Sequence, residues 1–590
     1  MKIGRTEKIW LASVLFFWVF YNFPGFPPYG SETACIVHGL ISFVGTVLSV
    51  YIGCKLTEKE YPLIEDEEQD ETAEEKMTTQ GLLSGKTVWI VFAAYFLFLI
   101  AIARYTTWKE KRDAGKVDLQ GGRFKWPVMV MTYIASCMSV WVFFAGPGAY
   151  YRYGLGYFFS EMCIYSMFPI ICYFTMTKVW LVNQQKHFTT PADFFFCRYK
   201  SKALTVIIDL VYIVCAVPFI SAVLVAGGRA AEVATGGAVS SQTFTLICGI
   251  IMTVFVMLGG VKSTALADAV QGWFFILALW AIIFVTLKIV FNGSIIEAFQ
   301  TVRVQTPDWF SYPGPIGICT YPSRVSYPLA CAFGYTLLLP QVFVRSGYYS
   351  AGLKDQRQMA FLAPFLQIIV WGGTMLIGLV ALAAMPDLTS SETELVIPYM
   401  CNIIAGTHGL LAQILMIVFL IGVLAVGLST ANALLMVMSS IIYKDLLVGI
   451  GHCKFKTSET SVIRVVILLF GAVTVAVSLM HWEYVYNLMI FADSLVESLF
   501  PALVFGIYCK WATRKAAITS ISVGAIIICL TFFVWDLGYV WYGTIGLATA
   551  FVLMYVVSKL TKDDPKDSED FYEALDSGHR RFMRIKAKIK

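Results

Sequence analysis

Several polar side chains stand inside long apolar stretches of the sequence, where such side chains are rare. They are the adjacent hydroxyl residues Ser429 and Thr430 and the carboxylates Glu161, Asp268, Asp493 and Glu497. Hydroxyl oxygens are ligands that hard cations prefer, and an ionisable group inside an apolar span is costly enough to suggest function. The alternative is structural, because Ser and Thr also bond to their own helix and an acid can pair with a nearby base.

No pattern of an enzyme accompanies these residues. The six His are scattered, and the 14 Cys lie mostly inside apolar runs without a Cys-x-x-Cys pair. The sequence also lacks a nucleotide-binding loop and the residue spacing of a metal site. We therefore expect a protein that is not an enzyme, needs no cofactor and is not driven by ATP.

The elements that position these residues are apolar helices. The chain is 58% hydrophobic and only 14% charged, with a mean hydropathy of +0.70, whereas a soluble protein carries roughly 25% charged residues. Apolar runs of about 20 residues recur along the chain, as bilayer-spanning helices require. The composition predicts an all-α polytopic membrane protein, multi-pass in a bacterial inner or plasma membrane. The net charge is +5, but the Lys and Arg residues lie in short connections between the spans and do not suggest that the protein binds nucleic acid.

About 15 spans are expected. They lie near 8–24, 35–54, 86–106, then as a core near 127–147, 154–181, 203–227, 242–260, 265–291, 326–346, 359–385, 408–443, 460–481 and 484–508, and finally near 512–535 and 538–560. The predicted organisation is a two-helix membrane extension (1–55), an acidic linker (56–85), a domain of 13 helices (86–560, core 127–508) and a basic cytoplasmic tail (561–590).

Positive charge orients the core. Lys and Arg cluster at 109–125 and 198–202 and recur on that same side as far as the C-terminus, which makes this side cytoplasmic. The long loops 292–325 and 386–407 are poor in Lys and Arg and are expected outside. The basic N-terminus disagrees, because three spans separate it from 109–125. It is therefore expected outside, unless the first segment is re-entrant.

Ten core helices with this orientation divide into two halves of five with opposite topology, a layout of many secondary transporters. Each half opens with an interrupted helix. The first contains IASCMSVWVFFAGPG, with a break expected between Ala135 and Ser139, and the second contains YPLACAFGYTLLLPQVFVR, interrupted at Gly334 and Pro340. Broken helices expose carbonyls and amides that bind ions, although Gly and Pro are also common in membrane helices in general.

The stretch GGVKSTALADAVQG, Gly259 to Gly272, resembles the signature of the sodium/solute symporter family. GGR at 121–123 also fits, and Ala267 departs from the Thr common in the signature. AGPGAYYRYGLGY (145–157) and FTTPADFFFCRYKSK (188–202) are most similar to the sodium/pantothenate symporter branch. The resemblance implies a LeuT-type inverted-repeat core of ten helices with flanking helices.

The resemblance also implies a site for the coupling sodium, the only metal expected. The hydroxyls of Ser429 and Thr430 match the ion-binding pair of the family, and the carbonyls of three further residues would complete the site: Ala135, Met138 and Val426. Asp268 matches a position on the sodium release path. The alternative for Asp268 is an interfacial acid paired with Lys262 or another base.

Substrate contacts follow from the same resemblance. Counted from GLG, Glu161 matches the carboxylate that binds substrate in sugar-transporting members, but with an anionic substrate it would be protonated, paired or structural. Trp141 and Val142 stand where relatives place polar ligands, which favours a substrate with an apolar portion. Gly146 is expected beside the same pocket.

The second half adds further candidates. Gln341 follows the break and is the better substrate ligand, because Arg345 is expected near the cytoplasmic end, where a base snorkels. Asp493 and Glu497 lie one turn apart on the last core helix, which lines the cavity in this fold. One of them could share a proton or pair with a base, or both could form an interfacial pair; Asp493 is the substrate candidate.

We therefore expect sodium-coupled uptake of a small organic solute by alternating access, with a carboxylate such as pantothenate as the substrate. A proton-coupled carrier using Glu161 or Asp493, and a symporter for a short monocarboxylate, an amino acid or a sugar, remain open. A membrane sensor is a remote alternative. The expected partners are a small molecule and membrane lipid, with the chain acting as a monomer.

Overall fold

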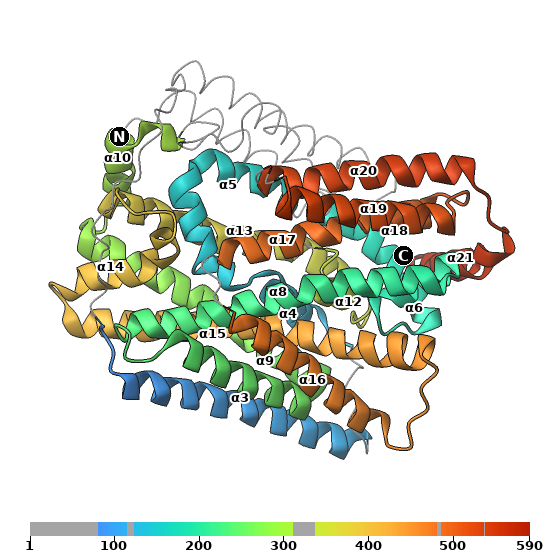
Figure 1. Ribbon diagram of the computed structural model, residues 1–590, viewed down its shortest axis with the longest axis horizontal. Coiled ribbons are helices and arrows are strands. Elements are labelled where there is room, and N and C mark those ends of the chain that lie inside the picture. The colour runs from blue at the N-terminus through green and yellow to red at the C-terminus, as the bar shows by residue number, and fades with distance from the viewer. Residues whose placement is uncertain are drawn as a thin grey trace.

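The computed structural model describes residues 81–114, 123–310, 315, 337–480, 485–535, 537 and 539–589. The predicted two-helix extension, most of the acidic linker and Gly334 lie outside these residues. The described part is almost entirely helical and forms an elongated bundle (Figure 1). One end of the bundle holds α6 (Thr177–Lys186) and α21 (Lys566–Ile589) and is called the α21 end. The opposite end holds α10 (Ile295–Gln305) and α14 (Val396–Ala405) and is called the α10 end.

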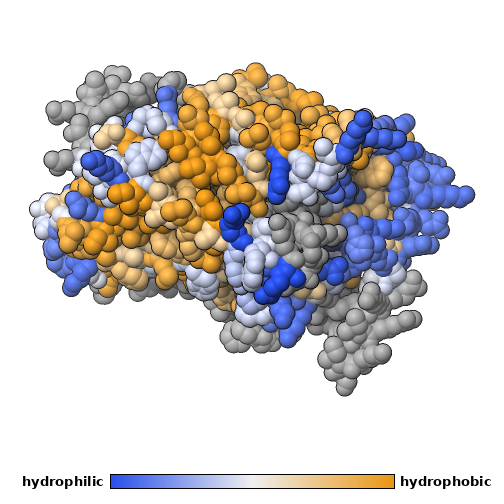
Figure 2. All heavy atoms as spheres, turned by 90° about the horizontal axis from the view of Figure 1, so that it is seen from below, coloured by the Kyte–Doolittle hydropathy of each residue, from blue (hydrophilic) through white to orange (hydrophobic). Residues whose placement is uncertain are grey.

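The bundle has the surface of a membrane protein. Nine helices in the described part are long and apolar enough to cross a bilayer. Figure 2 shows a broad apolar surface on the body of the bundle, with polar residues gathered toward its ends. Many large apolar side chains stay exposed on the outer helices, among them Leu277 at 66% and Leu469 at 62%. In water such a surface would drive aggregation, whereas in lipid it is the expected exterior.

The first core helix is broken at the predicted place. Helix α4 (Trp126–Cys137) ends before Met138 and Ser139, whose backbones are extended, and a short 3₁₀ turn η1 (Val140–Val142) follows. The chain then continues as α5 (Ala145–Ile171). An extended backbone inside an apolar layer leaves carbonyls without helical partners, and these must be satisfied by other groups.

A second interruption lies within α5 itself. Gly154 has φ 77° and ψ −171°, a conformation essentially restricted to glycine, and divides α5 into the end of one core helix and the start of the next. A Cβ atom there would also lie 2.5 Å from the carbonyl oxygen of Trp309. The segment AGPGAYYRY is thus helical, and the turn comes only at GLG. The second helix continues through the π-helical η2 (Cys172–Met176) into α6.

Helix α9 (Ser241–Val290) contains two crossings joined at Gly260, where φ is 66°. Its contacts with α3 (Gly85–Ala114) show the reversal. Trp89 packs on Phe244 and Thr107 bonds to the Leu258 carbonyl, so the chain first runs along α3. Tyr95 then bonds to Gln271, which places the later residues back toward the start of α3. The separate spans predicted near 242–260 and 265–291 agree with this path.

The second half begins with α12 (Pro340–Gly347), where Pro340 occupies the first turn and Leu339 is non-helical, as expected for a break. The other core helices follow the predicted spans. They are α8 (Lys202–Ala234), α13 (Leu353–Ala384), α15 (Gly409–Ser440) with its π-helical extension η5 (Ile441–Ile450), α16 (Glu459–Ser478), α17 (Val485–Glu497) and α18 (Phe500–Tyr508). Two flanking helices, α19 (Arg514–Phe533) and α20 (Tyr539–Leu560), pack on each other and on α17.

The two ends of the bundle differ in charge as the loop composition predicted. The basic segments at 198–202, 444 and 510–515 meet at the α21 end, where Lys200 and Arg514 pair with acids of the C-terminal segment. Most of the predicted basic tail forms helix α21. The loops predicted to lie outside contribute short helices at the α10 end: η3 (Pro307–Phe310) and η4 (Glu392–Leu395), besides α10 and α14.

Candidate functional site

The hydroxyl pair of α15 lies directly against the break after α4. Ser429 Oγ donates to the Ala135 carbonyl at 2.8 Å, and Thr430 Oγ1 contacts the carbonyls of Ala135 at 3.0 Å and Met138 at 2.8 Å. Both hydroxyls also contact the Val426 carbonyl of their own helix, at 2.9 and 3.3 Å. The structure thus brings together all five predicted sodium ligands.

This cluster has the chemistry of a site for a hard monovalent cation. All five candidate ion ligands are neutral oxygen atoms, and none of the five residues is more than 1% exposed. Three are backbone carbonyls, two of which belong to the broken helix. Oxygen ligands suit hard ions, and the negative ends of carbonyl dipoles offset the desolvation of a single positive charge. Because the hydroxyls come from α15 and two carbonyls from the α4 break, an ion here would hold the two helices together.

A buried ion pair lies next to this cluster. Arg345 Nη2 of α12 contacts Asp268 Oδ2 of α9 at 2.6 Å, and the two side chains are 6% and 0% exposed. Arg345 Nη1 also donates to the Thr132 carbonyl at 3.0 Å and to the Ser136 hydroxyl of α4. The guanidinium therefore fastens α4, α9 and α12 together within one turn of Ala135.

The position of Arg345 differs from the expectation. The sequence distance from the break suggested a base that snorkels to the membrane surface, but α12 is short and is enclosed by α4, α6 and α15. Its basic side chain is consequently turned inward. Asp268 does pair with a base, as the structural alternative proposed, although the partner is Arg345 rather than Lys262.

Gln341 stands one turn before Arg345 and is fully buried. Its amide nitrogen lies 3.4 Å from the Ser136 carbonyl, and its Oε1 has no hydrogen-bond partner among the described residues. The side chain thus faces the α4 break with one acceptor unused. A buried acceptor without a partner costs free energy, and a polar ligand at the break could satisfy it.

Trp141, Val142 and Gly146 form an apolar wall beyond the break. The indole of Trp141 packs edge-to-face on Trp371 of α13, with ring centroids 6.2 Å apart. A Cβ at Gly146 would lie 2.7 Å from both the Trp141 indole and the Thr374 methyl, so only glycine lets α5 approach this closely. These positions can supply contact area and shape but few hydrogen bonds.

Asp493 and Glu497 have different surroundings. One turn before Asp493 on α17, Met489 contacts the Ser139 hydroxyl at 3.8 Å, which places this part of the helix beside the α4 break. Asp493 is 8% exposed. Glu497 packs on flanking helix α20 instead, because a Cβ at Gly543 would lie 2.3 Å from its Oε2. Asp493 thus lies one turn beyond the contact with the break, whereas Glu497 lies against α20.

Glu161 is held by two tyrosines. Tyr150 OH donates to Oε2 at 2.5 Å and Tyr157 OH to Oε1 at 2.7 Å, and all three side chains are buried. Tyr150 precedes the Gly154 turn and Tyr157 follows it. The carboxylate thus connects the two limbs of the turn, which favours the structural alternative for Glu161 over contact with a substrate.

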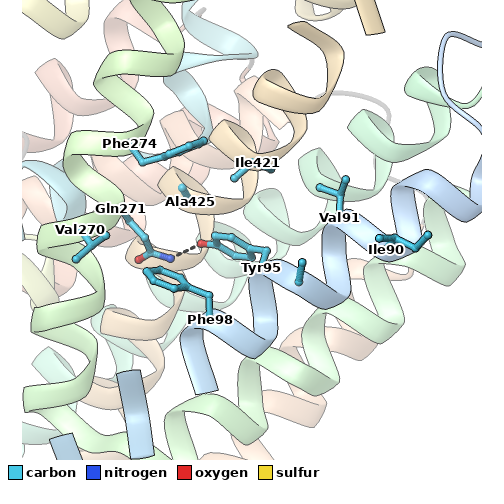
Figure 3. Close-up of a pocket in the computed structure, with 10 residues that line it drawn as sticks. Ile90, Val91, Tyr95, Phe98, Val270, Gln271, Phe274, Ile421 and Ala425 are labelled. Carbon is cyan, nitrogen blue, oxygen red and sulfur yellow. Dashed lines mark hydrogen bonds between the residues drawn. The ribbon is translucent and has the colours of Figure 1, made fainter. Parts of the chain in front are cut away.

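The last residues of the signature contact a flanking helix. Gln271 donates to the hydroxyl of Tyr95 in α3, and both residues line an apolar cavity of about 370 Å³ between α3, α9 and α15 (Figure 3). Residues at its mouth, such as Ile90 at 67% exposure, face the membrane side of the bundle. None of the five residues of the oxygen cluster at the α4 break lines this cavity, and the bond from Gln271 to Tyr95 connects α3 to the core.

Two buried polar residues on helices of the core were not singled out in the sequence. Gln367 of α13 is fully buried, with Nε2 at 3.5 Å from the Tyr133 hydroxyl of α4. Asn432 of α15 follows Thr430 by two residues and has an Oδ1 without a partner among the described residues. Both interrupt apolar helices, which is the same signal that identified Glu161 and Asp493.

Comparison with known proteins identifies relatives of the whole core. The model of the sodium:solute symporter family matches residues 119–524. The sodium/pantothenate symporter of Escherichia coli (strain K12) is 27% identical over 404 residues, covering 68% of this chain and 80% of the relative. The sodium/pantothenate symporter of Haemophilus influenzae is 26% identical over 403 residues, covering 67% of this chain and 80% of the relative.

The fold also has a solved counterpart. A substrate-bound, outward-open sodium-coupled sialic acid symporter superposes with a TM-score of 0.66 at 15% identity, covering 80% of this chain and 98% of that one. At this identity the likeness concerns the fold alone. It agrees with the LeuT-type core that the resemblance to the sodium/solute symporter family implied.

Proposed function

Because the chain belongs to the sodium:solute symporter family, we propose that this multi-pass protein of the cell membrane uses sodium entry to take up a small organic carboxylate such as pantothenate. The observation that carries the proposal is the meeting of the Ser429–Thr430 hydroxyls with the Ala135 and Met138 carbonyls across the α4 break. This oxygen cluster joins helices from both halves of the core, as an ion that couples two conformations requires.

Sodium would act by stabilising one arrangement of α4 against α15. On binding, the hydroxyls would turn their lone pairs to the ion instead of donating to the carbonyls. A ligand shifts a conformational equilibrium only by its difference in affinity between the states, and this site exists only while the two helices meet. Each sodium that enters down a potential of 100 mV supplies about 2.3 kcal/mol from voltage alone.

The substrate would lie between the two breaks. Trp141 and Val142 would face its apolar portion, with Gly146 beside them, while Gln341 and Asp493 would contact its polar groups. Two kinds of observation support a carboxylate with an apolar body: the pantothenate symporters among the relatives and the wall that Trp141 shares with Trp371. Glu161 is kept as a substrate contact only if its tyrosine partners rearrange.

The Asp268–Arg345 pair would close the release path toward the α21 end, the predicted cytoplasmic side. A sodium ion leaving the cluster past Asp268 would meet the positive charge of Arg345 unless α12 first moves away from α9. The pair would thus keep the inner path closed until the core rearranges, and Asp268 would then be free to attract the departing ion.

Reconstituted protein tests this function. Proteoliposomes are loaded with low sodium and given labelled pantothenate, lactate or proline under an inward sodium gradient or an inward proton gradient. We expect pantothenate to accumulate only under the sodium gradient. Accumulation driven by protons alone would favour a proton-coupled carrier, with Asp493 or Glu161 as the candidate proton site. Failure of all three solutes under both gradients would reject the substrate class.

A further inference from the structure

The C-terminal helix α21 lies against the core at the predicted cytoplasmic end, and one face of it is buried. Phe571 and Ala574 are 0% and 2% exposed, and Gly578 lies against Leu181 of α6. Glu569, Glu573 and Asp576 are exposed on the other side. This spacing is that of an amphipathic helix docked on a protein surface. In Figure 1 the helix lies next to α6, far along the bundle from α10.

Polar contacts fix α21 to the corner formed by α6 and α7 (Pro191–Tyr199). Asp570 pairs with Lys186 at the end of α6 and, at 3.5 Å, with Lys200 at the end of α7. Gln185 donates to the Ala574 carbonyl at 3.2 Å and to the Ser577 hydroxyl. The corner belongs to the first half of the core, because it connects the second core helix to the third.

Arg198 of α7 joins this corner to the last core helix. It is 3% exposed, and its guanidinium donates to the carbonyls of Gly506 at 2.8 Å, Cys509 at 3.0 Å and Ala512 at 3.1 Å. Tyr572 of α21 completes the set, since its hydroxyl lies 3.1 Å from Arg198 Nε and donates to the Gly506 carbonyl at 2.9 Å. One cluster thus contains α7, α21 and the turn between α18 and α19.

Helix α7 in turn contacts α12, which carries Arg345 of the pair proposed to close the release path, and η5, which continues α15. Phe571 of α21 packs on Phe194, with centroids 5.3 Å apart, and Phe194 packs at 6.4 Å on Phe343, two residues before Arg345 on α12. On its other side, Asp193 pairs with Lys444 of η5 at 2.7 Å, and η5 is the continuation of the helix that carries Ser429 and Thr430.

We propose that α21 is a latch that stabilises the closed state of the α21 end of the transport path. Under the proposed function that end opens when α12 moves away from α9, and α7 contacts α12, η5 and α18. A helix docked across α6, α7 and the α18–α19 turn makes its full set of contacts in the closed arrangement. In the open arrangement these contacts are weakened or lost, so the docked helix shifts the equilibrium toward closure. The proposal rests on the proposed function in taking this end as the exit.

Alkylation of native cysteines tests the latch without a substrate. Cys172, the first residue of η2, is 1% exposed, and η2 packs on α12. Cys453, in the loop after η5, is exposed and serves as the internal reference. The full-length protein in inside-out vesicles is treated with N-ethylmaleimide, and modification of each cysteine is followed by peptide mass spectrometry. The variants are Phe571→Ala, Phe571→Leu and Asp570→Asn, with Asp576→Asn as the matched control.

We expect the modification rate of Cys172 relative to Cys453 to rise about fivefold in Phe571→Ala, which removes part of the free energy of docking. The rise should be smaller in Asp570→Asn, because an exposed ion pair contributes less to that free energy. Phe571→Leu should fall between wild type and Phe571→Ala, and Asp576→Asn should match wild type. Asp570 is 51% exposed, so its replacement leaves the core intact and decides the question even if Phe571→Ala does not fold.

An unchanged Cys172 rate in Asp570→Asn, or an equal rise in Asp576→Asn, overturns the proposal. The buried Cys248 of α9 reports general unfolding, because it lies in the crossing of α9 that runs along α3, and its rate should stay low in every variant. If wild-type protein fails the sodium-driven uptake assay while Cys172 responds as expected, the transport assignment fails and the latch stands. If uptake succeeds and Cys172 does not respond, the latch alone is wrong.

Discussion

Arg345 of α12 and Asp268 of α9 form a buried ion pair, with 2.6 Å between Nη2 and Oδ2, that connects the two halves of the core. The same guanidinium bonds to the Thr132 carbonyl and the Ser136 hydroxyl of α4. One charged side chain thus fastens the segment that supplies the Ala135 carbonyl to the candidate ion site. Because both side chains are buried, either charge without the other would be costly.

Asp268→Asn and Arg345→Gln should each lower stability more than the double variant does. Removing one partner leaves a buried charge uncompensated, which costs about 3–5 kcal/mol, whereas removing both avoids that penalty. The measurement is the apparent melting temperature of the purified protein in detergent. A double variant whose loss equals the sum of the two single losses would show that the charges do not interact.

Gly154→Ala should destabilise the turn in α5. The conformation at φ 77° and ψ −171° costs a side chain about 1–3 kcal/mol, and a Cβ would also press on the Trp309 carbonyl at 2.5 Å. Gly372→Ala is the matched control, because nothing lies within 4 Å of its Cβ position. We expect a lower melting temperature only for Gly154→Ala; equal melting of the two variants would contradict the assigned backbone.

Glu161→Gln should weaken the protein rather than its affinity for substrate. An amide accepts only one of the two tyrosine hydroxyls through oxygen, so one buried donor loses its partner, at a cost of about 1–3 kcal/mol. Tyr150→Phe should have a similar effect on melting. Uptake kinetics provide the second readout: a KM raised tenfold with unchanged melting would identify Glu161 as a substrate ligand instead.

Docking of α21 should not depend on pH between about 5 and 9. The hydrogen bond and charge of Lys186 lower the pKa of Asp570 from its ordinary value of 3.8, and the bond to Asp570 raises the pKa of Lys186 from 10.5. The contribution of Asp570 is therefore present above its ordinary pKa and lost as the pH falls through the lowered value. That of Lys186 is present below its ordinary pKa and lost as the pH rises through the raised value.

Hydrogen exchange of residues 566–578, corrected for the intrinsic pH dependence of exchange, measures this docking. Besides Lys186, Lys200 just after α7 lies 3.5 Å from Asp570, and Glu573 of α21 acts on Lys186. Protection that disappears at pH 5 would mean that the ion pairs do not hold the helix.

The helices could be predicted because they depend on local sequence, and the meeting of the five oxygen-bearing residues could be expected because the family resemblance implied it. Apolar runs define the spans, Gly and Pro mark the breaks, and the position of Ser429 and Thr430 within the family pattern pairs them with Ala135 and Met138. Contacts made through tertiary packing could not be predicted in this way. The Tyr157–Glu161 bond spans one helical turn, but Tyr150 reaches Glu161 only because the chain reverses at Gly154.

Arg345 and α21 illustrate the same limit. Hydropathy gives the depth of Arg345 along its span but not the helix face it occupies, and that face is set by α4 and α9. The tail after Thr561 has no continuous apolar run, so its helix was not expected. Its buried face depends on Phe571 meeting Phe194 of α7, a contact between residues far apart in the chain.

The sodium dependence of uptake by the Ser429→Ala, Thr430→Ala double variant tests the central claim most directly. The control is Ser439→Ala, because the Ser439 hydroxyl donates only to the Met436 carbonyl of its own helix among the described contacts. We predict that the sodium concentration for half-maximal uptake rises at least about tenfold in the double variant, as expected when two ligands worth about 1 kcal/mol each are lost, and is unchanged in the control. Wild-type sodium dependence in the double variant would contradict the ion site between α4 and α15.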